Sequence, residues 1–99
     1  MNLKVDSIYT FKLNSGEEVV AKVVADNGDT ITITDPVSIA PTQQGMGLVP
    51  SLFTNKMHGN VTLNTKNVSL FGETDDSVKT KYIEATTGLK VPDKKVIMG

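Results

Sequence analysis

The chain has 99 residues, with eleven acidic residues against ten lysines, no arginine, no cysteine and a net charge of −1 at pH 7. This length predicts one domain, residues 1–99, with a single thin core. The lack of cysteine excludes disulfides, thiolate zinc sites and cysteine nucleophiles. Strong duplex binding is disfavoured because lysine lacks the planar fork of arginine. No stretch approaches the roughly 20 apolar residues that cross a bilayer, so we expect a cytoplasmic protein without membrane contact.

The first half of the chain predicts three antiparallel strands, over Ile8–Leu13, Glu17–Ala25 and Thr30–Ile39. Apolar residues alternate with polar ones in these segments, and glycine-bearing turns separate them. The second strand is apolar on both faces, which predicts a bend, and the small Ala21 near its middle fits that bend. Pro36 lacks a ladder donor and therefore marks an edge or a kink.

The next part of the chain combines loop and strand signals. Pro41–Pro50 is bounded by prolines and carries two glycines, which predicts a loop. Ser51–His58 and Val61–Leu63 then indicate either a strand pair or one long bent strand, and Val68–Phe71 indicates a last strand.

The last quarter of the chain predicts a helix over residues 75–87 and a tail over residues 89–99. Apolar residues recur there at helical spacing, at Val78, Tyr82, Ala85 and Leu89. Asp75 suits the start of the helix and Gly88 its end. The predicted fold class is mainly β, with a C-terminal α-helix packed on the sheet.

Two stretches of this pattern are similar to the two motifs of a known family. The first stretch contains Phe11, Leu13, Gly16, Val19, Ala21, Val23, Asp26, Thr30, Ile31 and Ile33, and the second runs from Val61 to Leu70. On these residues the chain resembles the Sm-like (LSm) family, whose fold is a strongly bent, five-stranded antiparallel small barrel of the SH3-like type. The resemblance covers residues 8–72, and it is nearest to the short members that phages encode, including marine cyanophage types.

The resemblance implies a homo-oligomeric ring of roughly five to seven subunits, in which strand edges pair head to tail. Here Leu52–Leu63 would pair with Val68–Phe71 of the next copy. The implied interface residues are Leu52, Val61, Leu63, Val68 and Leu70. A phage-encoded member would act in the host cytoplasm.

The resemblance also implies that two turns, Asp26–Asp29 and Asn64–Asn67, line the ring pore and bind single-stranded RNA. The candidate pore residues are Asp26, Asn27, Thr30, Asn64, Thr65 and Lys66. Thr30 stands where the family has a base-stacking asparagine, and Asn64-Thr65 stands where it has Arg-Gly. The alternative for each turn is an ordinary polar turn between strands, and the residue types favour this simpler interpretation.

No catalytic or metal-binding set is readable in the sequence. His58 is the only histidine and has no neighbouring ligands in the chain, which favours a role in capping a turn. Without a base and nucleophile pair, we expect no enzyme activity, no cofactor and no metal. Two hypotheses remain: a ring that binds RNA at its pore, and a structural or protein-interaction ring, used in phage assembly or host takeover, without nucleic-acid binding.

Overall fold

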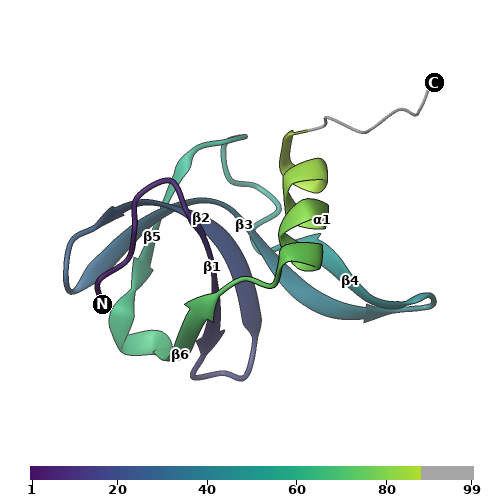
Figure 1. Ribbon diagram of the computed structural model, residues 1–99, viewed down its shortest axis with the longest axis horizontal. Helices are drawn as coiled ribbons and strands as arrows, with labels where there is room; N and C mark the ends of the chain where they lie inside the picture. The colour runs from purple at the N-terminus through teal and green to yellow at the C-terminus, as the bar shows by residue number, and fades with distance from the viewer. Residues whose placement is uncertain (88–99) are drawn as a thin grey trace.

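The computed structural model describes residues 1–87 and consists of a curled antiparallel sheet with one helix beside it (Figure 1). Its elements in chain order are β1 (Ile8–Leu13), β2 (Glu18–Asp26), β3 (Thr30–Thr42), β4 (Gly45–Pro50), β5 (Asn60–Asn64), a short 3-10 turn (Thr65–Asn67), β6 (Val68–Glu73) and α1 (Asp76–Thr87).

The sheet is organised around the long strand β3. The order of neighbouring strands is β4-β3-β2-β1-β6, and β5 pairs with the first half of β3, on the side away from β2. Register shifts in β2 at Val20/Lys22 and Val23/Ala25 mark irregularities that increase twist and bend the strand. The predicted bend at Ala21 is therefore confirmed, and Ala21 is fully buried there.

The predicted fold class is confirmed: the chain is mainly β, with a small bent antiparallel sheet and a C-terminal helix. The structure has six strands, whereas the resemblance implies five. The additional strand is β4, which lies in the segment predicted as a loop. β4 and β5 pair with the same edge of β3 but are separate strands, because residues 51–59 leave the sheet between them. No pairing joins the two ends of the sheet in the described chain, so it does not close on itself.

The loop predicted over Pro41–Pro50 is wrong. β3 continues to Thr42, and β4 pairs with it from Val37↔Pro50 to Thr42↔Gly45. Gly45 has φ 108°, a value that glycine adopts readily and that allows the tight return of the chain. The prolines misled the sequence reading because they occupy ladder positions at the margin of the sheet, where a missing donor is tolerated.

The strand predicted over Ser51–His58 is also wrong, since this segment contains only turns and bends. Both of its ends are fixed to β3. The Ser51 backbone N donates to the Pro36 carbonyl (3.0 Å), and His58 Nδ1 lies 3.0 Å from Asp35 Oδ1. These contacts hold the segment, called the 51–59 loop below, as a defined excursion from the sheet.

The helix predicted over residues 75–87 is confirmed as α1, Asp76–Thr87. The Asp75 carboxylate accepts from the Ser77 backbone N (3.1 Å), as an N-cap residue does. The Tyr82 hydroxyl accepts from Lys22 N (3.1 Å) and donates to the Thr34 carbonyl (3.1 Å), which ties the helix to two strands. The predicted contribution of Leu89, the stop at Gly88 and the tail over 89–99 lie outside the described residues.

Two hydrophobic clusters lie on opposite faces of the sheet. The inner core is centred on Phe11, Ala21, Val23 and Ile31, which have no exposed surface. The helix-side cluster joins Val20, Val37 and Tyr82, with Val78 packed against them. Val20 and Ala21 belong to different clusters because neighbouring residues of a strand point to opposite faces of the sheet.

Candidate functional site

The two turns nominated as pore loops lie side by side in the structure. The carbonyl of Asp29 accepts two hydrogen bonds from Thr65, from its backbone N (3.1 Å) and its Oγ1 (2.8 Å). Thr30 pairs with Asn64 in the β3–β5 ladder directly beside this contact. The structure therefore brings the Asp26–Asp29 and Asn64–Asn67 turns into one polar surface, called the loop cluster below.

Asn14 is a third member of the loop cluster that the sequence reading did not single out. Its backbone N donates to the Asn67 carbonyl (2.7 Å), and its Nδ2 donates to the Lys66 carbonyl (2.8 Å). Its Oδ1 accepts from Ser69 Oγ (2.7 Å). The only sequence signal was an asparagine in a glycine turn, which is too common to indicate a contact 52 residues away.

The carboxylate of Asp26 is engaged within the chain. Its Oδ2 accepts from Leu3 N (3.1 Å) and its Oδ1 accepts from Gly28 N (3.1 Å). These backbone donors, Leu3 first and Gly28 second, lower the pKa of Asp26 from its usual 3.8. Asp26 therefore anchors the N-terminal segment and shapes its own turn, which uses oxygen atoms that a bound base would otherwise contact.

The other nominated residues differ in whether their side chains already form hydrogen bonds within the chain. Asn27 Nδ2 donates to Thr32 Oγ1 (3.2 Å), and Asn64 Oδ1 accepts from Lys66 N (3.0 Å). The side chain of Lys66 is exposed and forms no ion pair within residues 1–87. Lys66 is consequently the group in the loop cluster that is best placed to meet a phosphate.

The nominated interface residues fall into two groups. The side chains of Val61, Leu63 and Val68 are partly buried and pack against the inner core. Leu52 and Leu70 are exposed, at 48% and 67%. The strands β5 and β6 can therefore offer their backbone edges to a neighbour. Of the nominated side chains, Leu52 and Leu70 are the exposed ones.

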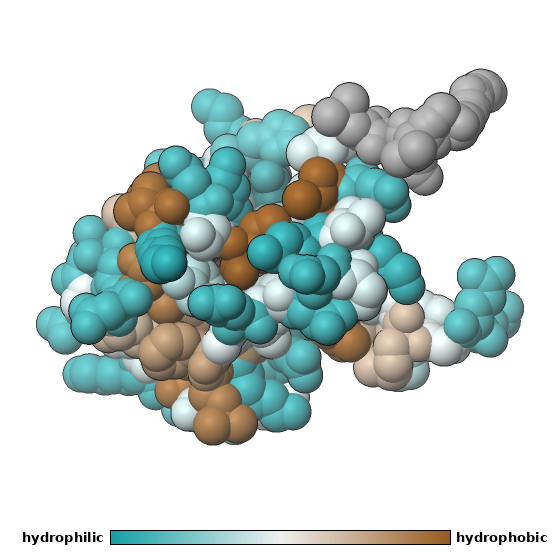
Figure 2. All heavy atoms as spheres, viewed as in Figure 1, coloured by the Kyte–Doolittle hydropathy of each residue, from teal (hydrophilic) through white to brown (hydrophobic). Residues whose placement is uncertain are grey.

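Three strands of the described chain have only one paired side. β4 and β5 each pair with β3 alone, and β6 pairs with β1 alone. Large apolar side chains flank two of these edges, Met46 on β4 (67% exposed) and Leu70 and Phe71 on β6. Met46, in the segment predicted as a loop, and Phe71, at the end of the last predicted strand, were not nominated from the sequence. Figure 2 shows hydrophobic residues reaching the viewed surface in several separate groups.

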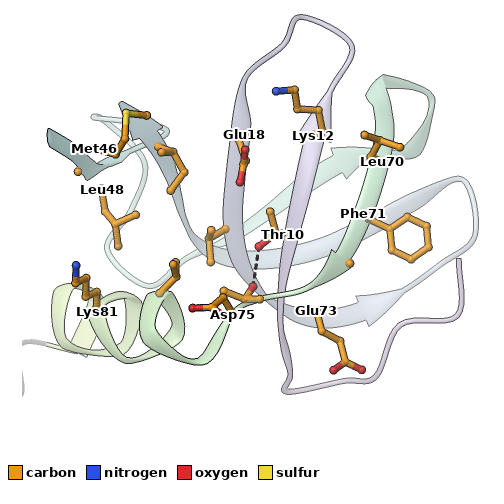
Figure 3. Close-up of a pocket in the computed structure, with 16 residues that line it drawn as sticks. Thr10, Lys12, Glu18, Met46, Leu48, Leu70, Phe71, Glu73, Asp75 and Lys81 are labelled. Carbon is orange, nitrogen blue, oxygen red and sulfur yellow. Dashed lines mark hydrogen bonds between the residues drawn. The ribbon is translucent and has the colours of Figure 1, made fainter. Parts of the chain in front are cut away.

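An open groove of about 770 Å³ lies on the helix side of the sheet, beyond the part that α1 covers. We call it the helix-side groove. Figure 3 shows Met46 and Leu48 on one side of it and Leu70 on the other, while the ring of Phe71, the next residue of β6, points away from it. The Thr10 and Thr74 hydroxyls, 2.9 Å apart, satisfy each other there, and Thr74 is buried. The groove is thus mainly apolar, with charged residues around its rim.

The single histidine, His58, holds one end of the 51–59 loop against β3. His58 Nδ1 contacts both carboxylate oxygens of Asp35, at 3.0 and 3.1 Å. Both residues have positive φ, 57° and 51°, so the pair closes the two ends of the 51–59 loop excursion with backbone conformations that are uncommon outside glycine. Within residues 1–87, no three His, Asp or Glu side chains gather as a metal site.

Two further observations bound the interpretation. The helix in the described part of the chain is too short and too polar to cross a membrane. Comparison with models of protein families and with curated proteins finds no match for this chain.

Proposed function

We propose that the protein is a non-enzymatic, ring-forming module of Sm-like type that presents its loop cluster to single-stranded RNA. The observation that carries the proposal is the coexistence of unpaired edges on β4 and β6 in one short sheet. Unpaired edges with apolar flanks favour pairing with another chain. Pairing of β4 with β6 of a second copy leaves a free β4 and a free β6 at the two ends, so the contact repeats.

This pairing uses a different edge strand from the one that the sequence indicated, namely β4 in place of Leu52–Leu63. The 51–59 loop contributes no strand, so β4 (Gly45–Pro50) is the natural partner for β6 (Val68–Glu73) of the next copy. The two strands have equal length, six residues each. Such a contact would place Met46 next to Leu70 or Phe71 of the neighbour and cover all three.

The mechanism of RNA binding would be avidity. Each copy offers Lys66 together with the amides of Asn27 and Asn64, which is a weak site by itself. Repetition around one axis multiplies weak contacts along a strand. Lysine contacts to phosphate would make the affinity fall with salt, with a slope near 0.7 for each phosphate neutralised on a single strand.

A second candidate function is a structural or protein-interaction ring without nucleic acid, of use in phage assembly or host takeover. Two observations favour it. The carboxylate of Asp26 is already engaged by Leu3 and Gly28, and the chain has no arginine. The loop cluster would then only stabilise the subunit.

Two measurements test these functions, and the second separates them. Light scattering at about 100 µM protein should give a mass of several subunits, and a monomer would remove the basis of both. Fluorescence anisotropy with U-rich and A-rich oligonucleotides should show saturable binding that weakens as salt rises. Lys66→Gln should weaken that binding severalfold, whereas Lys79→Gln on α1 should not. A ring that binds neither oligonucleotide would establish the second function instead.

A further inference from the structure

The turn between β2 and β3 carries the only Asn-Gly pair of the chain, Asn27 and Gly28, and both residues are exposed. Gly28 has φ 89°, and a Cβ added to it would meet no atom within 4 Å. Because Gly28 has no side chain of its own and open space beside it, other groups can approach its backbone closely. The group next to the Gly28 nitrogen along the chain is the side-chain amide of Asn27.

The side chain of Asn27 is held by one hydrogen bond. Its Nδ2 donates to Thr32 Oγ1 (3.2 Å), and its Oδ1 accepts no hydrogen bond from residues 1–87. The Gly28 nitrogen donates to Asp26 Oδ1 (3.1 Å). That N–H bond lies in the plane of the peptide, whereas a nitrogen that attacks a carbonyl carbon uses electrons perpendicular to the plane. The hydrogen bond to Asp26 therefore leaves the reactive face of the Gly28 nitrogen open.

Asn14, in the turn between β1 and β2, has the opposite arrangement. Its Nδ2 donates to the Lys66 carbonyl (2.8 Å) and its Oδ1 accepts from Ser69 Oγ (2.7 Å), partners that lie 52 and 55 residues further along the chain. Rotation of the Asn14 amide toward its own backbone would break both bonds. Rotation of the Asn27 amide breaks one bond, which is longer. The two exposed asparagine turns therefore differ in how readily the side chain can reach the following backbone nitrogen.

We propose that Asn27 is a site of spontaneous covalent modification, at which the side chain cyclises onto the backbone and is then hydrolysed. The Gly28 nitrogen attacks Cγ of Asn27, a C–N bond forms, the Cγ–Nδ2 bond breaks, and Nδ2 leaves as ammonia with the proton that Gly28 loses. Water then opens the five-membered imide. Opening of the new C–N bond gives aspartate, and opening of the original peptide bond gives isoaspartate. Water is the only co-reactant.

The modification changes the charge of the loop cluster. Either product places a carboxylate at position 27, in a turn that already contains Asp26 and Asp29. Isoaspartate also lengthens the main chain of the turn by one carbon. A third negative charge opposes the approach of a phosphate, which Lys66 on the adjacent turn favours. The chemistry does not depend on RNA, whereas its effect on affinity rests on the proposed function.

Peptide mapping by mass spectrometry tests the modification, with folded protein incubated at mildly alkaline pH. Ser15→Gly is the matched variant, because it creates a second Asn-Gly pair at Asn14 in an exposed turn. In the folded variant Asn14 should convert about fivefold more slowly than Asn27, equivalent to about 1 kcal/mol of activation free energy, the net worth of one additional hydrogen bond. In concentrated urea the two should convert at the same rate. An unmodified Asn27, or equal rates in the folded variant, would overturn the proposal.

Fluorescence anisotropy tests the consequence separately. Wild-type protein should lose oligonucleotide affinity during the incubation, and fresh Asn27→Asp should already show the weakened binding. Asn27→Gln keeps an amide but would have to form a six-membered ring, so its affinity should stay constant. Conversion at Asn27 without loss of affinity would refute the effect on the loop cluster and leave the modification site in place. If fresh wild-type protein bound no oligonucleotide, the proposed RNA function would fail, and the mass-spectrometric result would still decide the modification.

Discussion

The two faces of the sheet differ in how far the chain covers them. The inner core is enclosed by β1, β2, β3 and the strands that follow, and Phe11 at its centre has no exposed surface. The helix-side face is covered by α1 only around Val20, Val37 and Tyr82, and the helix-side groove continues beyond them. One face is therefore enclosed within the chain, whereas the other retains exposed apolar surface. Substitutions on the two faces should separate stability from association.

The largest effect is expected from Phe11→Ala in the inner core. Removal of a fully buried aromatic side chain leaves a cavity and should cost about 3–5 kcal/mol of unfolding free energy. Urea unfolding followed by circular dichroism measures this loss. A loss below 1 kcal/mol, roughly the effect of a surface change, would contradict the central position of Phe11.

A smaller effect is expected from Tyr82→Phe, which keeps the ring and removes the hydroxyl. Lys22 N and the Thr34 carbonyl would each lose a partner, at a cost of about 1–3 kcal/mol. Burial raises the pKa of Tyr82 from 10.0 to about 12. The stabilisation from this shift is complete below pH 10 and is lost as the pH rises through about 12.

The alkaline part of that prediction has its own control. Wild-type protein should lose stability between about pH 10 and 12, and Tyr82→Phe should lose less over the same interval. Thermal unfolding at a series of pH values measures both. Parallel curves for the two proteins would show that Tyr82 does not titrate as described.

Leu70→Ser in the helix-side groove should change the unfolding free energy by less than about 0.5 kcal/mol, because Leu70 is 67% exposed in the single chain. It should nevertheless weaken self-association, which sedimentation velocity at several concentrations would detect. Phe11→Ala and Leu70→Ser thus form a pair, the first acting on folding and the second on assembly. A strongly destabilised Leu70→Ser monomer would break the contrast between the faces.

The smallest and most pH-dependent effect is expected from Asp26→Asn. The two backbone donors lower the pKa of Asp26, so its stabilisation is complete above the unfolded value of 3.8 and disappears as the pH falls through the folded value. The melting temperature of the variant should therefore be lower than that of the wild type at pH 7, and the difference should shrink below about pH 4. A difference that is constant with pH would exclude the carboxylate as its source.

The sequence predicted the inner core better than the edges of the sheet. Phe11, Val23 and Ile31 lie at alternating apolar positions of the three predicted strands, and the structure buries all three in the inner core, because burial imposes a strict period of two on a strand. The hairpin of β3 and β4 was missed because its pairing depends on a partner strand, while Pro41 and Gly45 give local signals of a loop. The local sequence pattern of a strand does not show which other strand pairs with it.

The candidate site shows the same limit. The two turns nominated as pore loops came from the family resemblance; the structure places them side by side through Asp29 and Thr65, and their role at a pore stays a prediction. Asn14 was not nominated, because its contacts join positions far apart in the chain. Val61 and Leu63 were nominated for an interface, and the structure packs their side chains against the inner core; sequence alternation does not distinguish a core face from a contact face.

The pairing of the first strand with the last has a consequence for the speed of folding. Thr10, near the start of β1, is hydrogen-bonded to Thr74, which directly follows β6, and the two are 64 residues apart in the chain. Closing so long a segment costs entropy before its contacts form, and topologies rich in distant pairings fold slowly, on the scale of about milliseconds to seconds. Until β6 pairs with it, β1 of the nascent protein would be paired only with β2 and would leave its other side open, and dilute conditions or a chaperone should favour its productive maturation.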